Sequence, residues 1–213
     1  MIDAGVETLI LGSFPSVASL GKAQYYGHPQ NQFWRLVGAA IGEPLSEMDY
    51  ETRKRTLLVH RIGLWDVIGA CVREGSLDAD IREPRHNDFV RVTGVASGLR
   101  RIFFNGKSAG KFERQFATWG YDTAVLPSSS PAYTLSYAAK LEQWRQIGVD
   151  QLAPARCGAQ PPARRGCRNT AQNIDGSDVE DVFVDRAANP CRIEVGAAGQ
   201  HRVRPREGRQ CLF

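Results

Sequence analysis

Short apolar runs alternate with stretches of helical spacing along roughly the first 150 residues of the chain. Apolar runs closed by Gly, Asn or Pro are typical of buried strands. The sequence contains four of them, at 7–13, 62–69, 100–106 and 121–127. Between these runs, apolar residues recur every three or four positions, which predicts helices. This alternation favours an α/β fold with a parallel sheet covered by helices on both faces.

The helices are expected where a capping residue precedes an apolar stripe. The segment 73–87, REGSLDADIREPRHN, lacks such a stripe and is predicted to be a polar loop. The predicted helices run over 31–41, from Ser46 with Asp49 as its capping partner, from an Asn87 N-cap to Leu99, around Phe112 to Trp119, and from Ser136 to Ile147.

The composition changes after Ala153. Residues 154–213 contain no Lys, Trp or Tyr, and their first part, PARCGAQPPARRGCRN, is rich in Pro, Gly and Arg. Such a segment buries too little apolar surface to fold on its own. We therefore predict one domain at 1–153 and a low-complexity, largely disordered tail at 154–213. Short groups in the tail such as VEDVFV and CRIEV are expected to form weak strands at most.

Charge and cysteine content narrow the function classes only slightly. The net charge is +4, and residues 1–154 hold 17 basic against 16 acidic residues, so any nucleic-acid contact must come from a local patch. No apolar run approaches the roughly 20 residues of a membrane span, and the N-terminus lacks the basic region of a signal peptide. A cytoplasmic protein is expected. The five cysteines show no C-x-x-C spacing, so no bound metal is expected.

Four polar loops follow the predicted strands, at 12–16, 65–66, 105–107 and 127–130. In open α/β sheets, ligands bind beyond the carboxyl ends of the strands. We therefore expect the four loops to converge on one site. The segment YYGHPQNQFW, residues 25–34, adds aromatic rings and a side-chain amide close behind the first loop.

Four motifs occur in a fixed order: LILGSFPS, YYGHPQNQFW, FFNGK and LPSSSPAY. Together they resemble the uracil-DNA glycosylase superfamily, and most closely its hypoxanthine-DNA (deoxyinosine) glycosylase branch. The intervening GLWDVI, REGSLDADIR and NDF segments are similar to that branch as well. The resemblance covers about residues 7–150, and its specificity lies in the order and spacing of all the motifs together.

The resemblance implies a three-layer α/β/α fold around a four-stranded parallel sheet. It also implies hydrolysis of the bond between a damaged base and its deoxyribose, with no metal or organic cofactor. The implied partner is DNA that contains deaminated bases, and we expect a monomer. Uracil- and mismatch-specific relatives carry Asp or Asn before the proline of the first motif, where this chain has Phe14. The branch it resembles assigns catalysis to the asparagine of the second motif, here Asn31.

The residues themselves suit these roles. The amide of Asn31 can hold a water molecule for attack on the sugar, although its position also fits a helix N-cap, and one Asn can do both. Phe14 is expected to stack on a flipped base together with Tyr26 or Phe33. His28 is expected to be structural rather than a catalytic electrophile.

The remaining candidates lie at the strand ends. Backbone N–H groups around Gly12 and Ser13 can bind a base carbonyl or the departing anion. Asp66 can accept from the N1–H of hypoxanthine, and the alternative is a solvent-facing loop carboxylate. Asn105 is expected either to contact the base or, by slight preference, to support the loops.

The last motif is expected to bind DNA. Its hydroxyls suit the phosphates on either side of a flipped nucleotide, and Ala132 or its neighbour can fill the gap left in the base stack. Positive charge nearby comes from Lys107. The predicted DNA-binding residues are Ser128, Ser129, Ser130, Pro131, Ala132 and Lys107.

Two alternatives stay open. One is a mismatch-directed uracil or thymine glycosylase, because FFNGK and LPSSS also resemble that branch, although Phe14 counts against it. The other is a non-catalytic DNA- or nucleotide-binding module of the same fold that has lost the residue that positions water.

Overall fold

A four-stranded parallel sheet forms the centre of the computed structural model, which describes residues 1–148, 191–195 and 201–205. The strand order is β2-β1-β5-β6, and every neighbouring pair is parallel. Each strand lies inside one of the four apolar runs, so these predictions and the α/β fold class are confirmed. The strands are β1 (Thr8–Gly12), β2 (Ile62–Asp66), β5 (Arg101–Asn105) and β6 (Asp122–Leu126).

The side chains of the central strands divide between two cores because successive residues of a strand point to opposite faces. Leu9 and Leu11 of β1 join one buried cluster, and Ile10 between them joins the other. In β5, Phe104 belongs to the first cluster and Phe103 to the second. A sheet that is buried on both faces in this way needs a layer of helices on each side.

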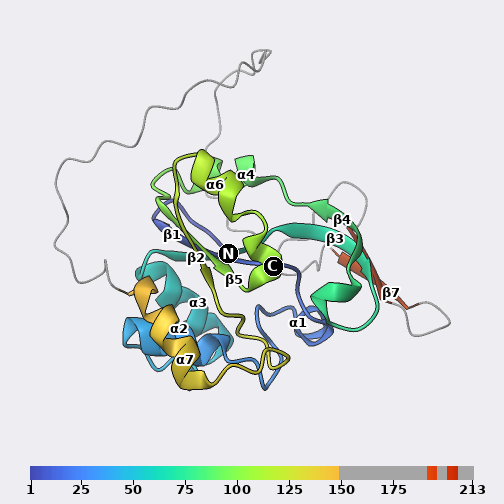
Figure 1. The fold of residues 1–213 in the computed structure, drawn as a ribbon, viewed down its shortest axis with the longest axis horizontal. Helices are drawn as coiled ribbons and strands as arrows, with labels where there is room; N and C mark the ends of the chain where they lie inside the picture. Colours follow the sequence, from blue (N-terminus) through green and yellow to red (C-terminus); the bar gives the residue numbers. More distant parts are fainter. Residues whose placement is uncertain (149–190, 196–200, 206–213) are drawn as a thin grey trace, which may run out of the picture.

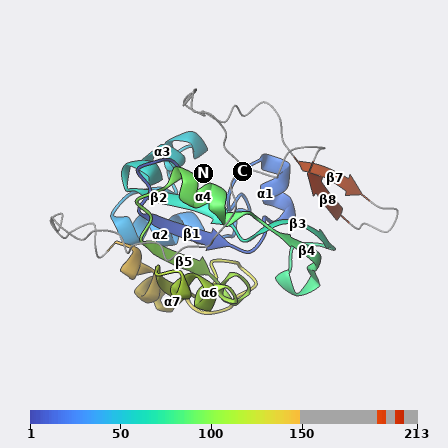
Figure 2. The same cartoon turned by 90° about the horizontal axis from the view of Figure 1, so that it is seen from above.

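Helices supply those two layers. Figure 1 shows α2, α3 and α7 together on one side of the sheet and α4 and α6 on the other, and Figure 2 gives the view from above. The molecule is therefore the expected three-layer α/β/α sandwich. The helices are α1 (Val17–Lys22), α2 (Phe33–Ile41), α3 (Tyr50–Val59), α4 (Phe89–Val95), α5 (Lys107–Gly110), α6 (Glu113–Thr118) and α7 (Tyr137–Trp144), with short 3₁₀ turns at Asp78–Asp80 and Arg145–Ile147.

Two helix starts differ from the prediction. α3 does not begin at Ser46, because Asp49 itself is the N-cap and accepts from the backbone N–H of Thr52. α4 is capped by Asp88, which accepts from the N–H of Val90, and not by Asn87. In both cases a carboxylate one or more residues further along captures the first free N–H groups of the helix.

One helix length also differs, because α4 ends at Val95 and does not reach Leu99. The helix predicted around Phe112 to Trp119 is confirmed as α6, whose N-cap is Phe112 and whose C-cap is Trp119. The helix predicted from Ser136 is confirmed as α7, whose N-cap is Ser136.

Three elements were missed by the sequence analysis, one of which is the short helix α5. α1 follows the first motif, with Ser16 as its N-cap. The predicted polar loop at 73–87 is wrong in part, because β4 (Arg82–His86) pairs antiparallel with β3 (Ile68–Arg73) to form a hairpin. Only Val67 separates β2 from β3, so the chain passes from the parallel sheet directly into this hairpin.

The second sheet has the order β4-β3-β8-β7. β8 (His201–Pro205) pairs antiparallel with β3 and with β7 (Cys191–Val195), and β7 coincides with the CRIEV group. The rest of the predicted tail, including VEDVFV, lies outside the described residues. In the described part of the chain, no helix has both the length and the apolar character that crossing a membrane requires.

Ser136→Ala is expected to lower the free energy of unfolding by about 1 kcal/mol, because the Ser136 hydroxyl accepts from the N–H of Ala139 at 3.3 Å. Urea denaturation measures the loss. Ser46→Ala is the matched control: the exposed Ser46 caps no helix, so its change should stay within about 0.5 kcal/mol. Equal losses in the two variants would contradict the assigned helix starts.

Candidate active site

Three predicted site residues stand at the carboxyl ends of neighbouring strands: Gly12 on β1, Asp66 on β2 and Asn105 on β5. Gly12 and Asp66 are direct partners in the parallel register. A Cβ added to Gly12 would overlap the carboxyl group of Asp66 and lie 3.2 Å from the hydroxyl oxygen of Tyr26. The absent side chain of Gly12 therefore leaves the space in which Asp66 and Tyr26 approach each other.

Tyr26 occupies an unusual backbone conformation, with φ at 52°. Positive φ is uncommon for a bulky side chain and marks a position held by its surroundings. Its ring lies on that of Phe33, with centroids 3.6 Å apart and an interplanar angle of 11°. Burial raises the pKa of the Tyr26 hydroxyl, and the nearby Asp66 raises it further, whereas a hydrogen bond with Asn105 acts in the opposite direction. The hydroxyl therefore stays protonated.

Phe33 has no exposed surface, since Tyr26 covers one face and Trp34 and Trp144 lie edge-on to the ring. The prediction that Phe33 lines the base site directly therefore needs correction: its ring supports Tyr26 from below. Of the two aromatic residues that the sequence offered beside Phe14, only the half-buried Tyr26 retains exposed surface.

Asp66 is only 8% exposed, which excludes the alternative of a solvent-facing loop carboxylate. Burial raises the pKa of this carboxyl group from 3.8 to about 7. The α-amino group of Met1 and the guanidinium of Arg73 lower the pKa, whereas Asp78 raises it. Both protonation states are thus accessible near neutral pH.

The side chain of Asn31 lies at the start of α2. Its Oδ1 accepts from the backbone N–H of Phe33 at 3.0 Å. The N-cap of α2 is Gln32, whose side chain makes no capping hydrogen bond, so Asn31 binds the first helical N–H from one position before the cap. The N-cap position that the sequence offered for Asn31 as an alternative is therefore wrong by one residue. The side-chain NH₂ group remains a second functional group on the same amide. In the preceding loop, Nδ1 of His28 accepts from the N–H of Gln30 at 3.2 Å, which agrees with the structural role expected for His28.

Asn105 and Ser129 bind each other through two hydrogen bonds. Nδ2 of Asn105 donates to the Ser129 hydroxyl, and the N–H of Ser129 donates to Oδ1 of Asn105, each at 2.9 Å. The N–H of Gln32 donates to the Ser129 carbonyl at 3.0 Å. These bonds fix the loop after β6 to β5 and to the residue after Asn31, which supports the loop-holding role for Asn105.

Ser129 was predicted to bind DNA, but it is completely buried, and its hydroxyl, N–H and carbonyl are all occupied by the bonds just described. The prediction for Ser129 is therefore wrong. A serine at this position satisfies buried polar groups of the loop, and its burial leaves no surface for a phosphate.

The other predicted DNA-binding residues lie near the surface. The hydroxyls of Ser128 and Ser130 each accept from a backbone N–H two residues on, at 3.2 Å, so each O–H can still donate. Pro131 and Ala132 are exposed at the tip of the loop. Below them, the buried ammonium group of Lys140 donates to the carbonyl of Ser130 at 3.4 Å. Lys107 is exposed at the start of α5.

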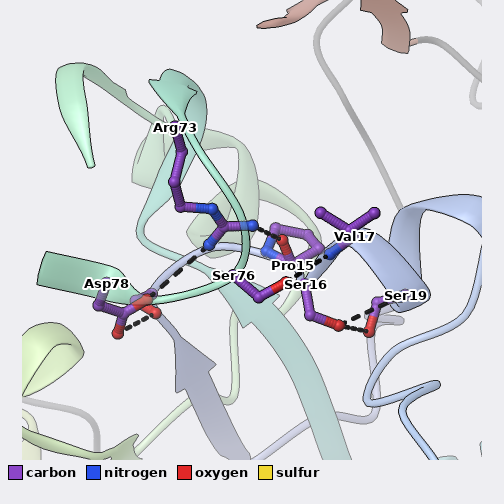
Figure 3. Close-up of polar contacts among 8 residues, drawn as sticks. Pro15, Ser16, Val17, Ser19, Arg73, Ser76 and Asp78 are labelled. Carbon is purple, nitrogen blue, oxygen red and sulfur yellow. Dashed lines mark hydrogen bonds and ion pairs between the residues drawn. The ribbon is translucent and has the colours of Figure 1, made fainter. Parts of the chain in front are cut away.

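Phe14 is also largely buried, but unlike Phe33 it keeps 8% of its surface exposed. Phe14 and Ser13 are held by residues that the sequence analysis missed. Figure 3 shows Arg73 and Asp78 beside the first motif. The Arg73 guanidinium carbon lies 5.0 Å from the centre of the Phe14 ring, and the Ser13 hydroxyl donates to Oδ2 of Asp78 at 2.7 Å. One sequence signal could have indicated Arg73: it directly follows the apolar residues of β3, a pattern that places the side chain of the arginine on a buried face.

Asn87 is a further missed residue of the site. Its Nδ2 donates to the carbonyl of Asp66 at 2.8 Å, and its backbone N–H donates to the carbonyl of Val67 at 3.0 Å. These bonds fix the chain where it leaves the parallel sheet. Within the described ranges, His, Cys, Asp and Glu side chains form no group of three or more that could bind a metal ion.

Asp66→Asn is expected to stabilise the protein at pH 8 and not near pH 4. Because the folded-state pKa is raised, the unfolded chain loses its proton first, and stability falls as the pH rises from about 4 to about 7. Asparagine carries no charge, so the variant should gain on the order of 4 kcal/mol over wild type across that interval. Urea denaturation at several pH values measures the difference, and a pH-independent difference would contradict the burial of an ionisable carboxyl.

The chain is similar in sequence to known proteins. The chain is 48% identical over 147 residues to a hypoxanthine DNA glycosylase of Methanosarcina acetivorans, covering 69% of this chain and 93% of the relative. It is 42% identical over 146 residues to a hypoxanthine DNA glycosylase of Methanosarcina barkeri, covering 68% and 92%. No family model matches the chain.

A solved structure shares the fold. A solution NMR structure of a Methanosarcina acetivorans protein, provisionally described as a uracil DNA glycosylase, superposes with a TM-score of 0.63 at 47% sequence identity. The match covers 68% of this chain and 93% of that one. The identities, the coverage of the relatives and the shared fold together lead to one conclusion: the chain belongs to the hypoxanthine DNA glycosylase family.

Proposed function

We propose that the protein is a monofunctional DNA glycosylase that hydrolyses the N-glycosidic bond of a deaminated base, with deoxyinosine as its preferred substrate. The observation that carries the proposal is the meeting of Gly12, Asp66 and Tyr26 at one edge of the sheet, in a chain 48% identical to a hypoxanthine DNA glycosylase. We further propose that it acts as a monomer on DNA in the cytoplasm.

The reaction requires three things of the site. The base must leave the stack, which costs a few kcal/mol and costs least for a weakly paired base such as hypoxanthine. The departing base takes the bonding electrons and must be stabilised as an anion. A water molecule must then be placed at C1′ of the sugar, which develops positive charge as the bond breaks.

Asp66 and the first motif supply base recognition in this proposal. The ionised carboxylate of Asp66 accepts from the N1–H of hypoxanthine, and the backbone N–H groups of Ser13 and Phe14 donate to O6 and to the charge that develops on the base. Gly12 lets the base approach the backbone closely. The rings of Phe14 and Tyr26 stack on the base, a contact worth roughly 1–3 kcal/mol for each base.

Asn31 positions the water. Its Oδ1 is directed to the N–H of Phe33, which fixes the plane of the amide, and the NH₂ group is left to orient water or a sugar oxygen. A neutral amide is a weak base, so it contributes by orientation and electrostatics rather than by removing a proton. This mechanism requires no carboxylate at the position of Phe14.

The loop after β6 holds the DNA backbone. The hydroxyls of Ser128 and Ser130 and the exposed tip at Pro131 and Ala132 bind the phosphates beside the flipped nucleotide and enter the space it leaves. Lys107 adds one positive charge. Hydroxyl donors bind phosphate without adding net charge, which agrees with the almost balanced charge of residues 1–154.

The proposal is tested with a panel of duplexes that contain deoxyinosine, deoxyuridine or a G·T mismatch, followed by alkali to break the strand at abasic sites. We expect strand breaks at deoxyinosine, with slower cleavage at deoxyuridine. Preferential cleavage of the mismatched duplex would favour the mismatch-directed alternative. Binding to every duplex without any cleavage would favour the non-catalytic module.

Asn31→Ala is expected to reduce single-turnover cleavage of deoxyinosine by well over tenfold, about 1.4 kcal/mol, because the water loses its amide. Asn31→Ser is the matched control for the hydrogen bond at the start of α2, since a serine hydroxyl can still accept from the N–H of Phe33. We expect Asn31→Ser to keep the stability of the wild type but to lose activity. Wild-type rates in both variants would remove Asn31 from the mechanism.

A further inference from the structure

The segment 73–78, here called the strap, crosses the first motif at residues 13–17, here called the base loop. Arg73 begins the strap and makes its central contacts. Nη2 donates to the carbonyl of Pro15 at 2.6 Å, and the guanidinium carbon lies 5.0 Å from the centre of the Phe14 ring. Figure 3 shows the Arg73 side chain directed at the base loop from β3. One cation thus fixes both the backbone and the aromatic ring of the loop.

Two other strap residues hold the ends of the base loop. The Ser13 hydroxyl donates to Oδ2 of Asp78 at 2.7 Å, and the backbone N–H of Val17 donates to the hydroxyl of Ser76 at 3.1 Å. Asp78 also forms an ion pair with Arg73, with Nη1 and Oδ1 4.0 Å apart. The Ser13 side chain, the Phe14 ring and the backbone of the base loop are therefore all contacted by three residues of one six-residue segment.

Arg73 is a costly residue for this position. It is only 4% exposed, burial lowers the pKa of its guanidinium, and Nη1 has no hydrogen-bond acceptor among the described residues. Replacing a buried ion pair by apolar side chains is often neutral or stabilising, so stability alone does not explain a charge here. An apolar side chain would also lack the bond to the Pro15 carbonyl.

We propose that Arg73 is a positioning residue of the glycosylase site, acting through Pro15, Phe14 and Asp78 to hold the base loop against a flipped base. The inference rests on the proposed function, in which the Phe14 ring and the backbone N–H groups of the loop bind the base. A displacement of about 1 Å in such a site can cost a hundredfold in rate, so a loop without regular structure needs a fixed support.

Arg73 and Asp78 also act on Asp66 in opposite directions. Arg73 lowers the pKa of the Asp66 carboxyl and Asp78 raises it, while the α-amino group of Met1 and the hydroxyls of Tyr25 and Tyr26 also interact with Asp66. Loss of the arginine should therefore move the pH midpoint of cleavage upward, and loss of the aspartate should move it downward. If the two substitutions only made the loop more mobile, the pH midpoint of cleavage would not shift in opposite directions.

The experiment compares Arg73→Met with Arg82→Met in the full chain. Methionine keeps most of the apolar stem of Arg73 and removes its donors, whereas Arg82 is an exposed arginine of the same hairpin that makes none of the strap contacts. Single-turnover cleavage of the deoxyinosine duplex should fall at least about tenfold in Arg73→Met. Its dissociation constant for undamaged duplex, and both quantities in Arg82→Met, should change less than about twofold.

A folded Arg73→Met variant that cleaves within about twofold of wild type overturns the proposal. So does an equal loss of duplex binding in both variants, because Arg73 would then act as a general positive charge. If Arg73→Met does not fold, Asp78→Ala serves instead, since the Asp78 side chain is 34% exposed. Wild-type cleavage by Asp78→Ala, with no downward shift of the pH midpoint, overturns the proposal as well.

Failure of the proposed function gives a different result. A wild-type chain that cleaves no duplex of the panel removes the glycosylase assignment, and hydrogen exchange at the Val17 amide then tests the strap. Faster exchange in Arg73→Met than in Arg82→Met supports the fixing of the base loop by Arg73. Equal exchange in the two variants overturns it.

Discussion

The close approach of β1 and β2 at their carboxyl ends is the constraint on which the site depends. Gly12 has no side chain, so the Asp66 carboxyl and the Tyr26 hydroxyl share the space beside it. From that point the contacts extend outward: Tyr26 to Phe33 and Asn105, Asn105 to Ser129, and Ser129 to the start of α2. A side chain at position 12 would displace Asp66 and Tyr26. The loops that are bonded to these residues would then move relative to one another.

Burial of charge is the second constraint. Asp66 and Arg73 lie almost completely out of solvent, and for each group burial is the largest influence on its pKa. Proteins rarely retain such groups without a use for them, because desolvation opposes folding. In this chain the two desolvated groups lie near the carboxyl ends of the parallel strands. Strand topology and the family resemblance both favour this edge of the sheet as the site of the proposed reaction.

The sequence alone was enough to predict the parallel sheet and the residues at the carboxyl ends of its strands. Apolar runs closed by Gly, Asn or Pro located β1, β2, β5 and β6, and the parallel topology then brought Gly12, Asp66 and Asn105 to one edge. Asn31 was found through its motif, and its place before an apolar stripe located the start of α2 to within one residue of the observed N-cap, Gln32. These features depend on local pattern and on one rule of topology, which a single sequence carries.

The errors at the site concern contacts between distant segments. Nothing local distinguishes Ser129 from Ser128 and Ser130, and only the bonds to Asn105, 24 residues away, make it an interior residue. Ser13 and Asp78 are 65 residues apart in the sequence. Their contact depends on the path of β3 back to the first motif, which no local pattern indicates. α1 was missed because its six residues are too few to display a helical period.

The junction at Val67 makes one continuous stretch of chain serve both sides of the base loop. Asp66 reaches Gly12 from the end of β2, and seven residues later Arg73 reaches Pro15 from the end of β3. Because only Val67 lies between β2 and β3, the carboxylate and the guanidinium that border the loop are placed by one short covalent segment. An insertion or deletion in that segment would therefore change the position of both charged groups relative to the loop.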